Sequence, residues 1–226
     1  MGTEARSIPS HRVCDQAETQ RSGFRQRFRS QFRKPTGFGG KVAGWIMAHR
    51  PSNRERNAWA VSLLEFQPTD HVLEIGFGPG VAIKLMSQLV TGGHVVGIDH
   101  SEVMLQQARK RNASVIEQGR VQLLLASMSE LPAVQDRFDK CLMVNVFHFW
   151  DNPGDVLRNV RRVMSLGGKI VVAFQPRFQG ATDEDTLKVG HNMVGTLKAA
   201  GFSDTHLEVK SMAPVSVACA VGTNEG

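Results

Sequence analysis

Three closely spaced glycines follow a continuous apolar run and form the feature with the clearest chemical meaning. Residues 72–76 read Val-Leu-Glu-Ile-Gly, and the chain continues Phe-Gly-Pro-Gly to residue 80. Gly76 and Gly78 let the backbone turn tightly and let a ligand approach without meeting a Cβ atom. A helix that begins near Gly80 directs its N–H groups at the same place. We therefore expect this turn to border a ligand-binding site.

The next apolar run, residues 94–99, ends in an aspartate that narrows the ligand class. In an open parallel sheet, a carboxylate at this place can accept hydrogen bonds from both ribose hydroxyls of a nucleoside. Asp99 could also cap the helix expected from Ser101, and the two roles can coexist. Val81 stands where a dinucleotide fingerprint needs a small residue, and no lysine follows as in a phosphate-binding loop. The pattern favours a nucleoside ligand bound through its ribose.

Strand-like and helix-like segments alternate around these residues. The pattern predicts strands at 72–76, 94–99, 121–127, 140–146 and 169–174, and helices at 81–89, 101–117, 156–164 and 184–200. Such alternation implies crossover connections and a parallel sheet with helices on both faces. Two last runs, 203–211 and 214–221, are joined by about two residues and should form an antiparallel hairpin. We predict an α/β Rossmann-like fold with a seven-stranded sheet, five strands parallel, and an N-terminal helical extension.

The order and content of these segments resemble the class I S-adenosylmethionine-dependent methyltransferases. The similarity is best to the small-molecule subgroup that includes the ubiquinone and menaquinone biosynthesis methyltransferases, and it covers about residues 68–222. It is carried by VLEIGFGPG (72–80), GIDHSEVMLQQAR (97–109), the ELP turn (130–132), FDKCLMVNVFHFW (138–150) and LGGKI (166–170). The resemblance implies S-adenosylmethionine as cofactor and direct transfer of its methyl group to a small-molecule acceptor.

The resemblance also implies roles for individual residues. Cofactor-binding positions would be Glu74, Gly76 and Gly78 at the methionine end, Asp99 at the ribose, His100 and Met104 beside the adenine, and Asn145 near the transferred methyl group. The family often has an acidic residue two places after the third strand, where it binds the adenine amino group. Here that triplet is Ala126-Ser127-Met128. Ser127 is neutral, so this adenine contact is weaker or comes from a backbone carbonyl.

His148 is the candidate catalytic base, because a neutral imidazole can accept the proton of a phenol or an alcohol. The sequence from His148 to Asp151 resembles the H-x-W-x-D region of phenol O-methyltransferases, although Phe149 stands where those enzymes usually have an acid. His148 could equally line the pocket or pack in the core. Trp150 is a candidate substrate-binding residue. Clustered carboxylates are lacking at the end of the fourth strand, so we expect no metal.

The N-terminal segment holds the excess of positive charge. From Thr19 to Arg54 there are nine basic residues and no acid, and Phe24, Phe28 and Phe32 would share one helical face. This segment could contact an anionic membrane through residues 21–34, or it could be a solvated extension whose phenylalanines pack on the domain. An alternative function is therefore a non-catalytic or weakly catalytic scaffold that binds RNA or an anionic membrane through this arm. Nucleobase methylation is disfavoured, since no Asn/Asp-Pro-Pro-aromatic motif follows the fourth strand.

We divide the chain into an arm and helical lid at 1–67 and a cofactor-binding domain at 68–226. The family commonly builds its substrate lid before the first strand, so Phe38, Trp45 and His49 are candidate substrate-binding residues, although Trp45 could be core. The 226 residues are 41% hydrophobic and 21% charged, with no long apolar run, and the three cysteines are scattered. These features predict a cytoplasmic protein. The oligomeric state stays open.

Overall fold

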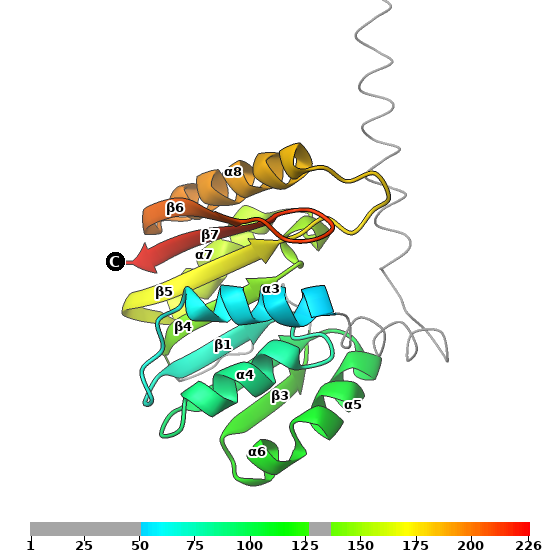
Figure 1. Ribbon diagram of the computed structural model, residues 1–226. Helices are drawn as coiled ribbons and strands as arrows, with labels where there is room; N and C mark the ends of the chain where they lie inside the picture. The colour runs from blue at the N-terminus through cyan, green and yellow to red at the C-terminus, as the bar shows by residue number, and fades with distance from the viewer. Residues whose placement is uncertain (1–50, 127–136) are drawn as a thin grey trace, which may run out of the picture. The chain divides into compact units, whose positions relative to one another are not determined.

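The computed structural model describes residues 51–126 and 137–226 (Figure 1). They form a seven-stranded sheet in the order β3-β2-β1-β4-β5-β7-β6. The strands are β1 His71–Ile75, β2 His94–Asp99, β3 Val121–Leu125, β4 Phe138–Val144, β5 Met164–Phe174, β6 Ser203–Lys210 and β7 Val217–Asn224. The helices are α3 Pro51–Ser62, α4 Val81–Leu89, α5 Glu102–Arg111, α6 Ala113–Glu117, the 3-10 helix η1 Phe147–Phe149, α7 Pro153–Val163 and α8 Asp183–Ala199.

The sheet has the predicted mixture of directions. Strands β1 to β5 pair in parallel, β7 pairs antiparallel with β5, and β6 pairs antiparallel with β7. The five parallel strands therefore end together along a line that we call the carboxyl edge, after Ile75, Asp99, Leu125, Val144 and Phe174. Ligands of open α/β sheets bind beyond such an edge. The predicted Rossmann-like fold is confirmed.

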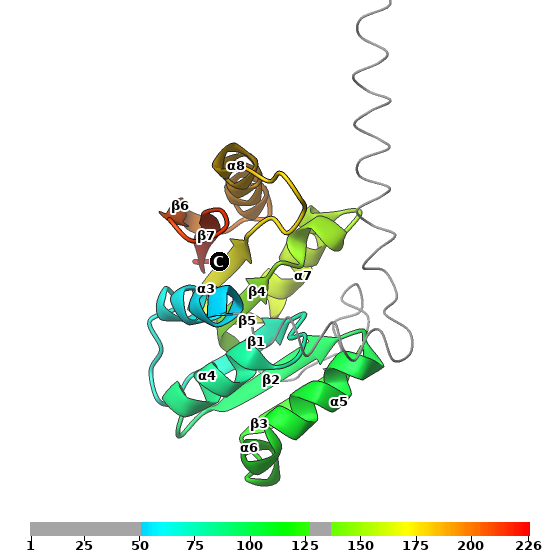
Figure 2. The same ribbon diagram turned by 45° about the vertical axis from the view of Figure 1, so that its right-hand side comes forward.

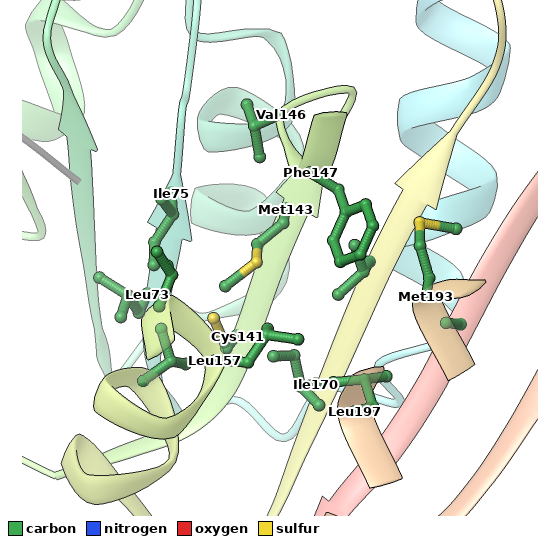
Figure 3. Packing of buried hydrophobic residues seen from close by; sticks show 14 of the residues in the cluster. Leu73, Ile75, Cys141, Met143, Val146, Phe147, Leu157, Ile170, Met193 and Leu197 are labelled. Carbon is green, nitrogen blue, oxygen red and sulfur yellow. The ribbon is translucent and has the colours of Figure 1, made fainter. Parts of the chain in front are cut away.

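Helices cover both faces of the sheet, and each face has its own core (Figure 2). Helices α3, α4 and α5 pack on the face that carries Val72 and Leu142, whereas α7 and α8 pack on the face that carries Leu73 and Ile75. Figure 3 shows the second core, where Leu157 of α7 and Leu197 of α8 meet the strands. Neighbouring residues of β1 thus point to opposite faces, as strand geometry requires.

Two predicted boundaries were wrong because side chains make contacts that local pattern does not reveal. The helix predicted at 101–117 is two helices separated at Asn112, whose Nδ2 donates to the carbonyl oxygens of Ala108 (2.9 Å) and Gly80 (3.1 Å). The link between the last two strands spans 211–216 rather than about two residues. Within it the N–H of Ser216 donates to Asp183 Oδ1 (2.7 Å), which keeps that residue out of the strand.

Two further strands differ from prediction. Strand β5 begins at Met164, before the predicted start at 169, and Gly167 and Gly168 lie inside it at an irregular register with β4. Strand β4 ends at Val144 rather than 146, since Asn145 has a positive φ of 56° that turns the chain away from the sheet. No helix among residues 51–126 and 137–226 is long and apolar enough to cross a membrane.

Candidate active site

The glycine turn begins where β1 ends, and its three glycines all have left-handed backbone conformations. The φ angles are 73° at Gly76, 50° at Gly78 and 74° at Gly80, which side chains other than glycine rarely adopt. The N–H of Gly76 donates to the carbonyl oxygen of Ile98 (2.7 Å), so β2 holds the start of the turn. Phe77 is buried beneath the turn. The turn is thus fixed to the sheet through both backbone and side chain.

Gly78 and Gly80 differ in what surrounds them. A Cβ atom on Gly78 would have no neighbour within 4 Å, whereas one on Gly80 would lie 2.8 Å from the Cβ of Ala108 and 2.7 Å from Asn112 Nδ2. Gly78 therefore borders open space at the carboxyl edge. Gly80 instead permits close packing between the start of α4 and the end of α5, a role that the spacing of the glycines did not distinguish.

Asp99 ends β2 and is 95% buried, with only 5% of its surface exposed. Its Oδ2 accepts from the N–H of Gly78 (2.8 Å), and its Oδ1 accepts from the N–H of Ser101 (2.9 Å). A carboxylate can accept further bonds at both oxygens, which leaves capacity for two ribose hydroxyls. The cap of α5 is Ser101, whose Oγ accepts from the N–H of Met104 (3.4 Å). Asp99 therefore organises the turn but does not cap the helix.

Glu74 lies in β1 one residue before its end, on the same face as Val72. It is 2% exposed, and its Oε2 has no hydrogen-bond partner. Burial, with a smaller contribution from the charge of Asp99, raises the pKa of Glu74 to about 8, although the backbone of Ile83 at the start of α4 partly opposes this. An unpartnered buried carboxyl group is costly. Glu74 is thus suited to pair with a cationic group of a ligand.

Of the residues predicted to flank the adenine, His100 lies beside Asp99 and Met104 packs in the core. His100 is exposed, and its Nδ1 is 3.8 Å from Asp99 Oδ1. Met104 is 7% exposed and packs in the core of the α3, α4 and α5 face. Leu125 ends the neighbouring strand β3 with 51% of its surface exposed, and sequence reasoning did not single it out. Ser127 and Met128 lie outside the described residues.

Asn145 links the ends of β4 and β5. Its N–H donates to the carbonyl oxygen of Ala173 (2.8 Å), and its side-chain Oδ1 accepts from the N–H of Gln175 (2.8 Å). The side-chain oxygen is therefore used within the protein, and a contact with the methionine part of a cofactor would fall to Nδ2. The structure places Asn145 at the carboxyl edge, one residue after β4, where the prediction had it at the end of the fourth strand.

His148 and Trp150 lie in an aromatic group just past Asn145. The His148 ring is 4.1 Å from the Phe149 ring and 5.5 Å from the Phe174 ring, measured between centroids. Burial lowers the pKa of His148 to about 4. Trp150 packs edge-on against Phe147, and its buried Nε1 has no hydrogen-bond acceptor among the residues that the structure describes. The imidazole is therefore neutral at physiological pH and sits in aromatic surroundings.

A buried polar network around Gln175, the residue after Phe174, was not predicted. Arg56 of α3 donates from Nη1 to Gln175 Oε1 (3.1 Å) and from Nη2 to Asn53 Oδ1, and Gln175 Nε2 donates to the carbonyl oxygen of Val215 (2.8 Å). Asn53, Arg56 and Gln175 are all at least nine-tenths buried. The sequence did hold one signal, since Asn53, Arg56 and Ala60 recur at helical spacing on one face.

Several predicted features cannot be placed. Phe38, Trp45 and His49, together with the basic segment 21–34, lie outside the described residues, so the lid and the membrane contact stay predictions, as does the domain boundary at residue 67. Within the described part, Ala60, Val61 and Leu64 are buried in the same core as β1. No group of metal-ligating side chains occurs in residues 51–126 and 137–226.

Comparisons with known proteins agree with this geometry. Residues 73–172 match the model of a methyltransferase domain. An uncharacterized methyltransferase of Bacillus subtilis, YdaC, is 33% identical over 79% of this chain and 96% of its own length. A ubiquinone/menaquinone biosynthesis C-methyltransferase of Geotalea daltonii is 24% identical over 56% of this chain, which spans about half (55%) of that relative.

A solved structure supports the fold. The crystal structure of an S-adenosylmethionine-dependent methyltransferase from Aquifex aeolicus has a TM-score of 0.62 and 21% identity, covering 80% of this chain and 97% of that one. At that identity the likeness concerns the fold alone, whereas the YdaC match extends along most of both sequences. The chain belongs to the class I S-adenosylmethionine-dependent methyltransferases.

Proposed function

We propose that this methyltransferase acts on a small molecule with an aromatic or other apolar part, bound at the ends of β4 and β5. The observation that carries the proposal is the aromatic group of His148, Phe149, Trp150 and Phe174 beside the carboxyl edge. Apolar walls with few polar atoms are typical of small-molecule sites. The buried Nε1 of Trp150 offers one donor to an acceptor molecule. The named C-methyltransferase relative is consistent with such an acceptor.

The residues on the β1 and β2 side fit S-adenosylmethionine. Asp99 has free acceptor capacity for the ribose, Gly78 leaves the approach open, and Glu74 presents an unpartnered carboxyl oxygen toward an ammonium group. When bound, S-adenosylmethionine supplies an electrophilic methyl group on a sulfonium. The protein then has to orient the acceptor nucleophile and exclude water. In this proposal the aromatic side chains at the end of β4 do both.

His148 acts in this proposal as a wall of the pocket rather than as the base. Its buried ring has a pKa of about 4, whereas a general base works best with a pKa close to the operating pH. The ring contacts to Phe149 and Phe174 are those of a packed side chain. An acceptor that ionises readily, such as a thiol or an acidic carbon, would need little help from a base of this kind.

The proposal is tested by incubating the protein with radiolabelled S-adenosylmethionine and a panel of phenols, thiols, amines and 1,3-dicarbonyl compounds. We expect label in at least one apolar acceptor, and we expect His148→Phe to retain activity within about tenfold. A loss of about 100-fold or more would instead identify His148 as the base. Binding of S-adenosylhomocysteine without methylation of any small acceptor, but with methylation of a protein or RNA, would overturn the proposal.

A further inference from the structure

Arg56, in the second turn of α3, is a buried cation with neutral partners. It is 5% exposed, and its described hydrogen bonds go to the amide oxygens of Gln175 and Asn53. No carboxylate of the described residues lies within ion-pair distance of its guanidinium, and Nε has no hydrogen-bond partner. Amide oxygens orient a guanidinium but do not neutralise its charge. A buried charge without a counterion is costly, so its presence calls for an explanation.

The position of Arg56 places this charge at the carboxyl edge. Its partner Gln175 is the residue that follows β5, and the N–H of the same Gln175 donates to Asn145 at the end of β4. Figure 1 shows the first turns of α3 lying over the ends of these strands. The guanidinium is therefore held, by contacts on two sides, next to the region where ligands of this fold bind.

We infer that Arg56 binds a carboxylate group of a ligand at the carboxyl edge. The inference rests on the proposed function, because it assumes that cofactor and acceptor bind here. A guanidinium donates from all of its nitrogens in a planar fork that matches the two oxygens of a carboxylate. Gln175 and Asn53 already hold Nη1 and Nη2 in place, whereas Nε has no partner. A carboxylate can therefore bond to Nε with little further loss of side-chain entropy.

Two ligands can provide the carboxylate. One is the methionine part of the cofactor, and the other is an acidic acceptor. The cofactor is favoured by Glu74, which has an unpartnered carboxyl oxygen at the end of β1. Glu74 and Arg56 thus place a carboxyl group and a guanidinium at the same edge of the sheet. An α-amino acid group needs such a pair, the carboxyl group for its ammonium and the guanidinium for its carboxylate. Experiments with ligands that have or lack this group separate the two sources.

The direct test follows the Nε–H signal of Arg56 by nitrogen-edited NMR of the full chain, with the signal assigned by its loss in Arg56→Lys. We expect S-adenosylhomocysteine to shift this signal and methylthioadenosine, which lacks the amino acid part, to leave it in place. If the acceptor supplies the carboxylate, acetate will shift the signal in protein saturated with S-adenosylhomocysteine. A signal that neither ligand moves, while S-adenosylhomocysteine shifts other resonances, overturns the inference.

Calorimetry of variants gives a second readout. If the cofactor supplies the carboxylate, Arg56→Met should weaken S-adenosylhomocysteine binding about 10- to 100-fold and leave methylthioadenosine binding unchanged. The control is Arg54→Met, two residues away on the same helix and exposed, which should change neither affinity. Equal weakening of both ligands would indicate a structural role and contradict the inference. Failure of the unmodified protein to bind S-adenosylhomocysteine would refute the proposed function as well.

Discussion

The two halves of the carboxyl edge are built differently. On the β1 and β2 side, the carboxylate of Asp99 is bonded to backbone N–H groups of the adjoining turns. On the β4 and β5 side, Arg56 and Asn145 both bond to Gln175, whose side chain also donates to the backbone carbonyl of Val215. The first half is therefore a cradle formed by backbone groups, whereas the second is a network that depends on side chains and can differ with the acceptor.

The halves also differ in how protons affect them. The pKa of Glu74 in the first half is raised to about 8, and that of His148 in the second is lowered to about 4, each chiefly by burial. Burial disfavours the charged form in both cases, which is the anion for Glu74 and the cation for His148. Glu74 should therefore lower the stability of the protein as pH rises, and His148 should lower it as pH falls.

The largest expected effect at a single pH distinguishes Gly80 from Gly78. Gly80→Ala should lower the free energy of unfolding by about 3 kcal/mol, because its Cβ would collide with Ala108 and Asn112 at a left-handed φ. Gly78→Ala meets no neighbour and should cost only about 1 kcal/mol, yet it should weaken S-adenosylhomocysteine binding. Urea unfolding and calorimetry measure the two quantities. Equal losses of stability would show that both glycines serve packing.

The effect of Glu74 is spread over a pH range. Because its pKa is raised in the folded protein, the folded state binds more protons than the unfolded state between about pH 4.5 and pH 8, so stability falls as pH rises through that window. Glu74→Gln should remove this fall in the free energy of unfolding, which is on the order of a few kcal/mol across the window. Urea unfolding at several pH values measures it, with the exposed Glu117→Gln as control. A Glu74→Gln variant with an unchanged slope would contradict this assignment.

The smallest effect concerns His148. Its pKa is lowered in the folded protein, so protonation of His148 should not reduce the free energy of unfolding above about pH 6.5. The free energy of unfolding should decline as pH falls from there toward about 4. His148→Phe should reduce this decline by about 1–3 kcal/mol, since phenylalanine cannot take up the proton. The exposed His191→Phe is the control. The comparison of the two halves fails if both His148→Phe and Glu74→Gln alter stability in the same pH range and with the same sign.

The glycine turn and Asp99 of the first half could be located from the sequence, whereas the Arg56–Gln175 network of the second half could not. Gly76, Gly78 and Asp99 could be placed because a strand, a glycine turn and a carboxylate at the next strand end follow one another along the chain. The bond between Arg56 and Gln175 joins residues far apart in sequence. The helical spacing of Asn53, Arg56 and Ala60 indicates a shared face but does not identify Gln175 as the partner. Similarly, the parallel direction of the first five strands followed from their alternation with helices, but the split at Asn112 and the late start of β7 depend on tertiary hydrogen bonds.

The central claim, that Asp99 and the glycine turn form the cofactor site, is tested most directly by calorimetric titration with S-adenosylhomocysteine. The matched pair is Asp99→Ala and Asp139→Ala, since the carboxylate of Asp139 also accepts from a backbone N–H, that of His71 (2.9 Å), but at the opposite edge of the sheet. We expect tight binding by the unmodified protein and by Asp139→Ala. Binding by Asp99→Ala should be at least about 100-fold weaker, because two charged hydrogen bonds are lost. Equal affinity in Asp99→Ala and the unmodified protein would contradict the account.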